Sequence, residues 1–408
     1  MSDSLYLPTG LGRVGYELAT GLARLGHEIG YIGWWHPAHV ITPPPPVPIE
    51  FWPVDGKRGG EEVLDTILDR WQPDALLTIG DLWNLGYVAQ PVRCQLRRYV
   101  QWIHYLSVDG EPVGGGLPPG CIPTLADVDW PVAYTQYAQR AMATSLGTDT
   151  EAMARVRVIY HGVNTEVFTP GDPGERARWR HQYGIDDKFL FLTVCRNQSR
   201  KNIPELFQAW KIFSELPEVR GRVVLWPHMV FTDPMGWAID DLLDVLKLRN
   251  RSILYYEQVA HAPSELQLIP DAELARLYQL ADAFVLLAGE GFGLPVFEAM
   301  ATKVPCLLMD CAATGELGAE GRAALVPVTG GLTWTGRHLT QRPIPKVDDI
   351  VAAMLKIYRD QVYRESIAQA GYDFARQYPW SRVVGEWAAL LRQIEVPFAQ
   401  PFSLEVVT

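Results

Sequence analysis

The sequence predicts two doubly wound α/β domains in tandem. Short apolar runs alternate with helical patterns along the chain, which is typical of the βαβ units that build parallel sheets. A length of 408 residues is too great for one ordinary core and fits about two domains. The stretch 169–174 has the composition of a linker, and the pattern restarts beyond it. We therefore expect an N-terminal domain at 1–168, a C-terminal domain at 169–382 and a final segment at 383–408.

The first half begins with a predicted helix whose apolar residues recur at helical spacing: Val14, Leu18, Leu22 and Leu25. Gly26 is a helix-ending residue directly after this run. A helix is also expected around 63–68. The apolar runs of this half predict strands at 29–34, 75–79, 99–103 and 156–160.

The second half repeats this organisation. Ile203, Leu206, Phe207 and Trp210 share one predicted helix face. Strands are expected at 189–195, 222–226, 283–287 and 305–309. Ligands of such sheets bind beyond the carboxyl ends of the strands, so we expect the site in the cleft between the two domains.

Composition and charge exclude some classes of function. A net charge of −11 argues against a nucleic-acid-binding surface, while peripheral membrane attachment stays open. The five cysteines form no C-x-x-C pair and no metal-ligand spacing. No apolar run reaches the roughly 20 residues that span a bilayer, and no secretory signal opens the chain. A cytoplasmic location is therefore expected.

The segment 283–309 carries the strongest chemical pattern, a strand, a glycine-rich turn, a helix and a strand. Gly291 and Gly293 let backbone approach a ligand closely, and Pro295 suits the first position of a helix. Glu290 in the turn and Glu298 inside the helix are hydrogen-bond acceptors when ionised, so together they could hold a polyol at two places. On these residues alone, an acidic helix start that stabilises the helix dipole stays an equal alternative.

Residues 290–301 read Glu-Gly-Phe-Gly-Leu-Pro-Val-Phe-Glu-Ala-Met-Ala. This run resembles, without departure, the E-x7-E signature of the retaining glycosyltransferases of family 4. The resemblance implies the GT-B fold, two Rossmann-like domains that enclose a cleft. It also implies that Glu298 binds the donor ribose, that Glu290 contacts hydroxyls of the donor sugar, and that the donor is further contacted by Gly291, Phe292, Gly293 and Leu294.

Arg196 and Lys201 follow the predicted strand 189–195 and resemble the Arg and Lys that neutralise the donor diphosphate in this family. Stabilising the negative charge of a nucleoside diphosphate leaving group is the main catalytic need of such a reaction. Two basic side chains could meet this need without a metal, so we expect no metal and no cofactor. Two solvent-facing basic residues on a loop are the structural alternative.

Three weaker positions also match the family. The turn 9–13 precedes the first predicted helix, and Gly10 and Gly12 correspond to glycines that approach the donor phosphates. His104 ends the strand 99–103 and would face the donor sugar as a catalytic residue. Asp109 follows on the loop and would serve the acceptor. The alternatives are a tight turn for the glycines, a capped strand end for His104 and a turn-forming Asp-Gly pair for Asp109.

The two ends of the chain carry further expectations from this resemblance. The segment 383–408 would form a helix that crosses back onto the first domain. Relatives begin with an apolar strand before the glycine turn, and residues 1–8 leave almost no room for it. We therefore expect the natural chain to start earlier, and a chain extended upstream to be more stable.

The reaction expected from these matches is transfer of a hexose-type sugar, with retention, from a nucleotide diphosphate sugar to an acceptor hydroxyl. UDP- or GDP-linked donors are favoured, and the acceptor is a glycan, a lipid or a small molecule. The alternatives are a nucleotide-sugar epimerase, a phosphorylase, for which no pyridoxal-phosphate lysine motif is present, and a non-catalytic nucleotide-sugar-binding module.

Overall fold

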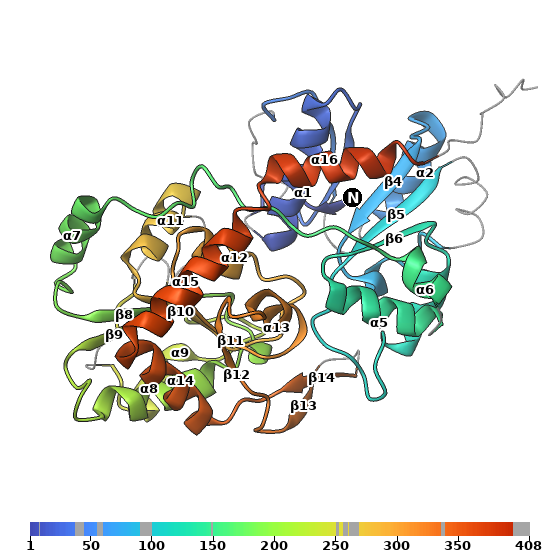
Figure 1. The fold of residues 1–408 in the computed structure, drawn as a ribbon. Helices are drawn as coiled ribbons and strands as arrows, with labels where there is room; N and C mark the ends of the chain where they lie inside the picture. Colours follow the sequence, from blue (N-terminus) through green and yellow to red (C-terminus); the bar gives the residue numbers. More distant parts are fainter. Residues whose placement is uncertain are drawn as a thin grey trace, which may run out of the picture.

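The architecture was obtained as a computed structural model. It describes residues 1–7, 9–36, 45–54, 60–89, 100–147, 150–249, 253–255, 260, 269–335 and 339–394. Figure 1 shows two sheets in separate halves of the molecule, each covered by helices. None of the described helices is both long and apolar enough to cross a membrane.

The first sheet is parallel throughout. Its strands are β1 (Ser2–Asp3), β2 (Gly30–Trp34), β3 (Glu50–Pro53), β4 (Ala75–Ile79), β5 (Gln101–Leu106), β6 (Trp130–Ala133) and β7 (Arg157–Val158). Ladders join β1, β2 and β3 and, separately, β4 to β7. Met1 joins the two groups, because its ammonium donates to the Leu77 carbonyl at 2.7 Å and its carbonyl accepts from the Ile79 amide at 2.9 Å. The spatial order is therefore β3-β2-β1-β4-β5-β6-β7, which is doubly wound.

The expectation that residues 1–8 leave almost no room for a strand before the glycine turn is corrected in part, because Ser2–Asp3 form the short strand β1 there. Burial lowers the pKa of the Met1 ammonium to about 5, because this group lies inside the sheet. Whether an upstream extension adds stability stays a prediction.

The helices of the first domain are α1 (Gly10–Arg24), α2 (Glu61–Arg70), α4 (Ile122–Ala126), α5 (Gln136–Leu146) and α6 (Thr150–Arg155), with the short turns η1 (Leu82–Asn84) and η3 (Pro119–Cys121). Thr9 caps α1, since its hydroxyl accepts from the Gly12 amide at 3.0 Å. Gly26 follows at φ +92°, and the His27 amide donates to the Leu22 carbonyl. The predicted helix stop is confirmed.

The second sheet is also parallel, with the order β12-β11-β10-β8-β9. Its strands are β8 (Phe189–Val194), β9 (Val223–His228), β10 (Ala283–Leu286), β11 (Cys306–Met309) and β12 (Ala324–Val326). The helices are α7 (Pro173–Gln182), α8 (Ile203–Glu215), α9 (Ile239–Val245), α11 (Asp271–Leu280), α12 (Leu294–Ala301), α13 (Ala312–Gly318), α14 (Val347–Arg359) and α15 (Gln361–Ala375). An antiparallel hairpin of β13 (Leu332–Thr335) and β14 (Thr340–Pro343) lies beside it. The predicted linker 169–174 is partly helical, because Asp172 caps α7 at Pro173.

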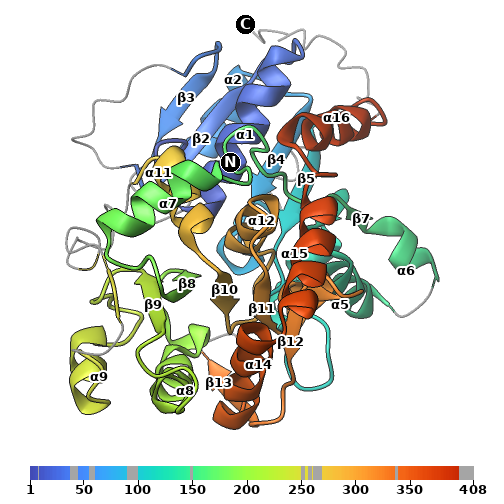
Figure 2. The same ribbon diagram turned by 60° about the vertical axis from the view of Figure 1, so that its left-hand side comes forward.

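The last described helix, α16 (Trp380–Leu391), extends from the second domain onto the first. Figure 2 shows it beyond the end of α15. It packs so closely on α1 that a Cβ atom on Gly21 would lie 2.4 Å from Val384 Cγ2. Trp387 is fully buried, with its ring 4.9 Å from that of Tyr105 in β5. Residues 395–408 of the predicted crossing segment lie outside the described residues, and the predicted domain boundaries stay predictions.

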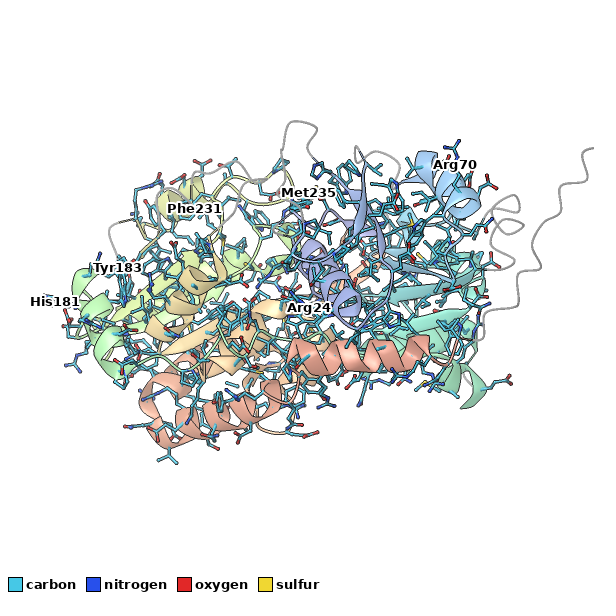
Figure 3. The ribbon with its side chains drawn as sticks, turned by 90° about the horizontal axis from the view of Figure 1, so that it is seen from above. Arg24, Arg70, His181, Tyr183, Phe231 and Met235 are labelled. Carbon is cyan, nitrogen blue, oxygen red and sulfur yellow. The ribbon has the colours of Figure 1, made fainter. Side chains whose placement is uncertain are left out.

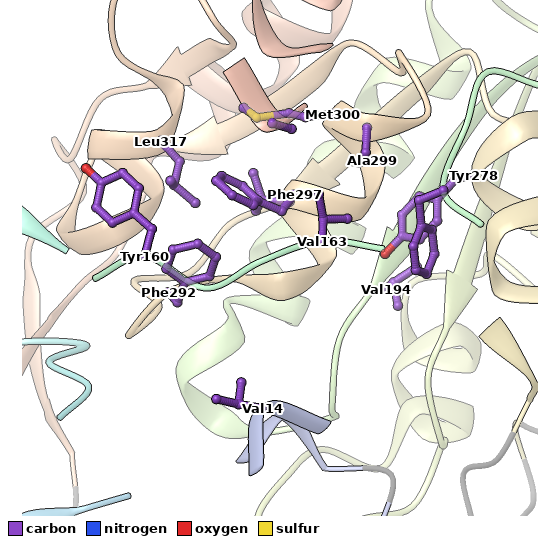
Figure 4. Close-up of a cluster of buried hydrophobic side chains, with 14 of the residues drawn as sticks. Val14, Tyr160, Val163, Val194, Tyr278, Phe292, Phe297, Ala299, Met300 and Leu317 are labelled. Carbon is purple, nitrogen blue, oxygen red and sulfur yellow. The ribbon is translucent and has the colours of Figure 1, made fainter. Parts of the chain in front are cut away.

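One apolar core cluster connects the two domains. It contains Val14 of α1, Val163 of the chain crossing between the domains, and Phe292 and Phe297 around the start of α12. Figure 4 shows several of these side chains together. The glycine-rich turn of 290–293 is therefore anchored in the core and also faces the junction of the domains.

Candidate functional site

The carboxyl ends of β8 and β10 meet at the switch point of the second sheet. The chain leaves β8 toward β9 on one side, while β10 lies on the other side next to β11. Sheets of this kind bind ligands in the crevice outside such a point. Arg196 and Lys201 follow β8, and Glu290 follows β10. Two neighbouring strands thus supply the predicted basic and acidic residues.

Glu290 is held by two cations. The Lys201 ammonium donates to Glu290 Oε1, and Arg200 Nη1 donates to Glu290 Oε2 at 3.3 Å. The Lys201 side chain is 5% exposed, so this ion pair is largely removed from water. Burial alone would raise the pKa of the Glu290 carboxyl, but Lys201 and Arg200 outweigh burial and lower this pKa to about 2. Glu290 is therefore an ionised hydrogen-bond acceptor at neutral pH.

Arg196 occupies a different position from Lys201. Its guanidinium Nε donates to Asp233 Oδ2 at 2.8 Å, and its side chain is 52% exposed. The structure therefore buries Lys201 beside Glu290 and leaves Arg196 at a more exposed point. The expected shared grip on a diphosphate stays a prediction. Arg200, at hydrogen-bond distance from both the Gly289 carbonyl and Glu290, is a third basic group beside the end of β10.

Glu298 lies in the second turn of α12 and is 4% exposed. Both of its carboxylate oxygens have partners. Arg13 Nη1 donates to Oε1 at 2.8 Å, and the Tyr278 hydroxyl donates to Oε2 at 2.9 Å. The two predicted glutamates are thus both ionic anchors, Glu290 within the second domain and Glu298 between the domains.

The glycine-rich turn is shaped by close approaches. A Cβ atom on Gly291 would lie 2.5 Å from Cβ of Ser107 in the first domain, so only glycine fits there. Gly293 precedes α12 at φ +99°, a left-handed conformation that favours glycine. Leu294 opens the helix, near Gly10 of the first domain.

The expectation that Phe292 contacts the donor is corrected for its side chain. Phe292 is 3% exposed, and its ring lies 4.5 Å from that of His161 and 4.8 Å from that of Phe297. Figure 4 shows it among buried apolar side chains. Its ring stabilises the turn from the core side, and only its backbone is left for a ligand.

Gly10 and Gly12 do not form a turn before the first helix, because α1 already begins at Gly10. The Gly12 amide donates to the Thr9 hydroxyl, and a Cβ atom on Gly12 would lie 2.5 Å from the Leu7 carbonyl oxygen. Gly12 is thus required by local packing. Its amide is already bonded, so the expectation that Gly12 binds phosphate is not supported by this geometry.

The expectation that His104 ends its strand is wrong. Strand β5 continues to Leu106 and pairs with β6 along this stretch. The side chain is fully buried, with Nδ1 2.8 Å from the Thr78 hydroxyl. Burial lowers the pKa of His104 to about 3, so the imidazole is neutral. Its other ring nitrogen, Nε2, is buried and has no hydrogen-bond partner among the described residues, so the predicted role of His104 toward the donor sugar stays a prediction.

Asp109 links the domains. Its Oδ1 accepts from Arg342 Nη2 of β14 at 2.7 Å, and its Oδ2 lies 3.7 Å from Arg200 Nε. Its backbone carbonyl also accepts from Arg342. The carboxylate predicted to serve the acceptor is therefore engaged by cations of the second domain.

Sequence reasoning missed Asp81, which lies two residues beyond the end of β4 in the first domain. Burial, and then the nearby Asp109, raise the pKa of Asp81 to about 7, although Arg200 and Arg342 oppose this. Its position after a strand end was a usable signal, since the carboxyl ends of these strands meet at the same edge of the sheet.

A further carboxylate across the domain junction was also missed. Glu316 of α13 accepts from the amides of Gln136 at 2.9 Å and Tyr137 at 2.6 Å, the free N–H groups at the start of α5. Tyr160 also donates its hydroxyl to this carboxylate.

The described residues contain no group of three His, Cys, Asp or Glu side chains placed to hold a metal ion. The expected independence from metal stays a prediction.

Comparison with known proteins gives a consistent set of relatives. A family model described as "Glycosyl transferases group 1" matches residues 252–360. A GDP-mannose-dependent alpha-(1-6)-phosphatidylinositol monomannoside mannosyltransferase of Mycolicibacterium smegmatis is 27% identical over 232 residues, covering 54% of this chain and 55% of that protein. The chain spans about half the length of the first curated relatives it matches.

Solved structures match over nearly the whole chain. Sucrose-phosphate synthase of Thermosynechococcus elongatus aligns with a TM-score of 0.70 at 18% identity, covering 95% of this chain and 94% of that one. The Anabaena protein HepE, in complex with UDP and glucose, aligns with a TM-score of 0.69 at 15% identity, covering 96% and 98%. At these identities the likeness concerns the fold.

Proposed function

Because the chain has the GT-B fold and is related to the group 1 glycosyltransferases, we propose that it transfers a hexose-type sugar from a nucleotide diphosphate sugar to an acceptor hydroxyl, with retention. The observation that carries the proposal is the ion-paired Glu290 at the switch point, with Glu298 on the helix that follows. Membership of family 4 is part of the proposal, since the matched model describes the broader group.

The donor lies with its diphosphate at the basic side chains of the crevice. Lys201 and Arg200 face Glu290, and Arg196 stands at the exposed edge. Together they supply positive charge for the leaving diphosphate, so the reaction proceeds without a metal. A relative depends on GDP-mannose and a structural neighbour was solved with UDP, which supports a GDP- or UDP-linked donor.

Glu290 orients the sugar and does not transfer a proton to it. A carboxyl whose pKa is lowered to about 2 is ionised at neutral pH, so it is a poor general acid, and its ion pair with Lys201 weakens it as a nucleophile. The acceptor therefore attacks on the face that the diphosphate leaves, and the diphosphate oxygen takes the acceptor proton. This assignment differs from the two-carboxylate mechanism of retaining glycosidases.

The test uses water as the acceptor, since the natural acceptor is not needed to observe donor cleavage. GDP-mannose and UDP-glucose are each incubated with the protein, and the released nucleoside diphosphate is quantified. NMR then identifies which anomer of the free sugar forms first, before mutarotation mixes the two anomers. We expect release with the anomeric configuration of the donor. Glu290→Gln should lower the rate at least about 100-fold, as for the loss of one key electrostatic contact. Glu320→Gln, whose side chain is 81% exposed in the same domain, should leave it unchanged.

The two alternatives give different results in the same assay. An epimerase converts the sugar into its epimer in the absence of an acceptor. A non-catalytic module binds the donor but releases no nucleoside diphosphate. Inversion of configuration, or a Glu290→Gln rate equal to that of the parent, would contradict the proposed mechanism.

A further inference from the structure

Arg13 links three elements around the second predicted glutamate. Its side chain extends from α1 of the first domain to α11 and α12 of the second domain. Arg13 and its partner Glu298 are 285 positions apart in the chain. Nη1 donates to Glu298 Oε1 at 2.8 Å, while Nη2 donates to both oxygens of Asp271 at 3.0 and 3.1 Å. One guanidinium therefore connects two carboxylates of the opposite domain.

The geometry fixes the orientation of Glu298. Arg13 holds one of its oxygens and the Tyr278 hydroxyl holds the other, at 2.9 Å. Each carboxylate oxygen has two lone pairs, so each retains one acceptor position. Asp271 fixes the guanidinium in turn. Because a guanidinium is planar and its donors form a rigid fork, holding one side determines where the other side points.

The surroundings of Arg13 fit hydroxyl donors. A pocket beside it is lined by Glu17, Asp271, Glu298 and Leu294, together with Asn164 of the chain between the domains. Three carboxylates around a single guanidinium leave an excess of negative charge, which favours groups that donate hydrogen bonds and disfavours phosphate. The pocket encloses about 20 Å³, so it admits a hydroxyl group of a ribose that lies at its mouth and neither the whole sugar nor a diphosphate.

We propose that Arg13 is a positioning residue, which orients Glu298 toward the ribose hydroxyls of the donor and is itself held in place by Asp271. This inference rests on the proposed function, and adds to it that a residue of the first domain determines ribose recognition in the second. Donor affinity then depends on the contact between the domains, because α1 brings Arg13 to the pocket.

The experiment compares nucleotides with and without ribose hydroxyls. Dissociation constants are measured by titration calorimetry for GDP and UDP and for their 2′,3′-dideoxy forms, with the full-length protein. A hydrogen bond from a hydroxyl to an ionised carboxylate is strong enough that the parent protein should favour the ribose form about tenfold or more. In Arg13→Met this ratio should fall below about threefold, because Glu298 loses its orientation.

Two further variants separate positioning from general stability. Asp271→Asn keeps Arg13 but weakens its anchor, so the ratio should also fall, and this variant serves if Arg13→Met does not fold. Arg13→Lys should give an intermediate ratio, since an ammonium attracts Glu298 but cannot hold both carboxylates in one plane. The matched control is Arg24→Met. Arg24 is exposed at the other end of α1 and should not affect the ratio (Figure 3).

The outcomes distinguish the inference from the function beneath it. A ratio that stays at the parental value in folded Arg13→Met, or in Asp271→Asn, overturns the positioning role while leaving nucleotide binding intact. If the parent binds neither GDP nor UDP, the proposed GDP- or UDP-linked donor is wrong and the inference is overturned with it. A parent that binds both forms equally contradicts ribose recognition by Glu298.

Discussion

Single carboxylates in the cleft differ widely in their electrostatic surroundings. Glu290 has its pKa lowered to about 2 by Lys201 and Arg200 in spite of burial, whereas burial and Asp109 raise the pKa of Asp81 to about 7. The first group is held in its charged form by cations of its own domain. Asp81 belongs to the first domain, and the charged group with the largest effect on its pKa is another carboxylate, Asp109. The junction therefore combines a fixed anion of the second domain with a titrating group of the first domain.

Asp81 predicts a dependence of stability on pH. Its pKa is raised in the folded state above the roughly 3.9 of an unfolded chain, so folding takes up a proton between about pH 4 and 7. The stability that this group contributes is complete below about pH 4 and is lost as the pH rises through about 7. Asp81→Asn should therefore be more stable than the parent at pH 8, by at most about 4 kcal/mol, and similar at pH 4.

Urea unfolding at the two pH values checks this prediction. The control is Asp69→Asn, on the exposed face of α2, which should show no such pH-dependent gain. An Asp81→Asn variant with the same stability increment at both pH values would show that the Asp81 carboxyl does not titrate in this range.

At the level of elements, the sequence was most informative where strands are buried on both faces. Strand β8 was expected at 189–195 and runs to Val194, and β10 was expected at 283–287 and runs to Leu286. Such strands are continuous apolar runs bounded by loops, so their ends are visible in the sequence. The approach of Lys201 to Glu290 follows from the same pattern, because adjacent parallel strands bring their carboxyl ends together.

Contacts between distant elements had no local signal. Arg342 lies on a hairpin strand that no pattern predicted, and its partner Asp109 is 233 positions away. Arg13 was visible as part of a glycine-rich stretch, but its partners depend on how α1 meets α11 and α12. The predicted strand end at residue 103, just before His104, was wrong because strand length depends on a neighbouring strand, here β6, and not on the apolar run alone.

A side chain larger than glycine at position 291, in the turn before α12, should clash with the first domain. In Gly291→Ala the new methyl would lie 2.5 Å from Cβ of Ser107, so the turn and the first-domain loop must move apart. Overpacking of this kind costs about 1–3 kcal/mol, and donor cleavage should slow because Glu290 precedes the displaced residue. Adding Ser107→Gly removes the clashing atom and should restore both stability and rate. The matched control is Gly385→Ala in α16, where a Cβ atom meets nothing within 4 Å.

Thermal melting and donor cleavage of the single and double variants decide this point. A double variant that is no better than Gly291→Ala would mean that the two loops do not touch in solution.

At the scale of the whole molecule, ion pairs and hydrogen bonds join the two domains on either side of their junction. Arg13 contacts Glu298, Arg342 contacts Asp109, and Glu316 caps the start of α5. The residues that anchor the donor in the proposal are thus partly the residues that join the domains. A ligand that fills the crevice is therefore expected to stabilise the molecule as a whole.

The most direct test of the central claim is a thermal unfolding screen with UDP-, GDP- and ADP-sugars, on the parent and on Glu298→Gln. A ligand at 100 times its dissociation constant adds about 2.7 kcal/mol to the stability of the folded state. We predict that at least one nucleotide sugar raises the melting temperature of the parent by several degrees, and that the shift is much smaller in Glu298→Gln. The account is contradicted if no nucleotide sugar stabilises the parent, or if Glu298→Gln is stabilised equally.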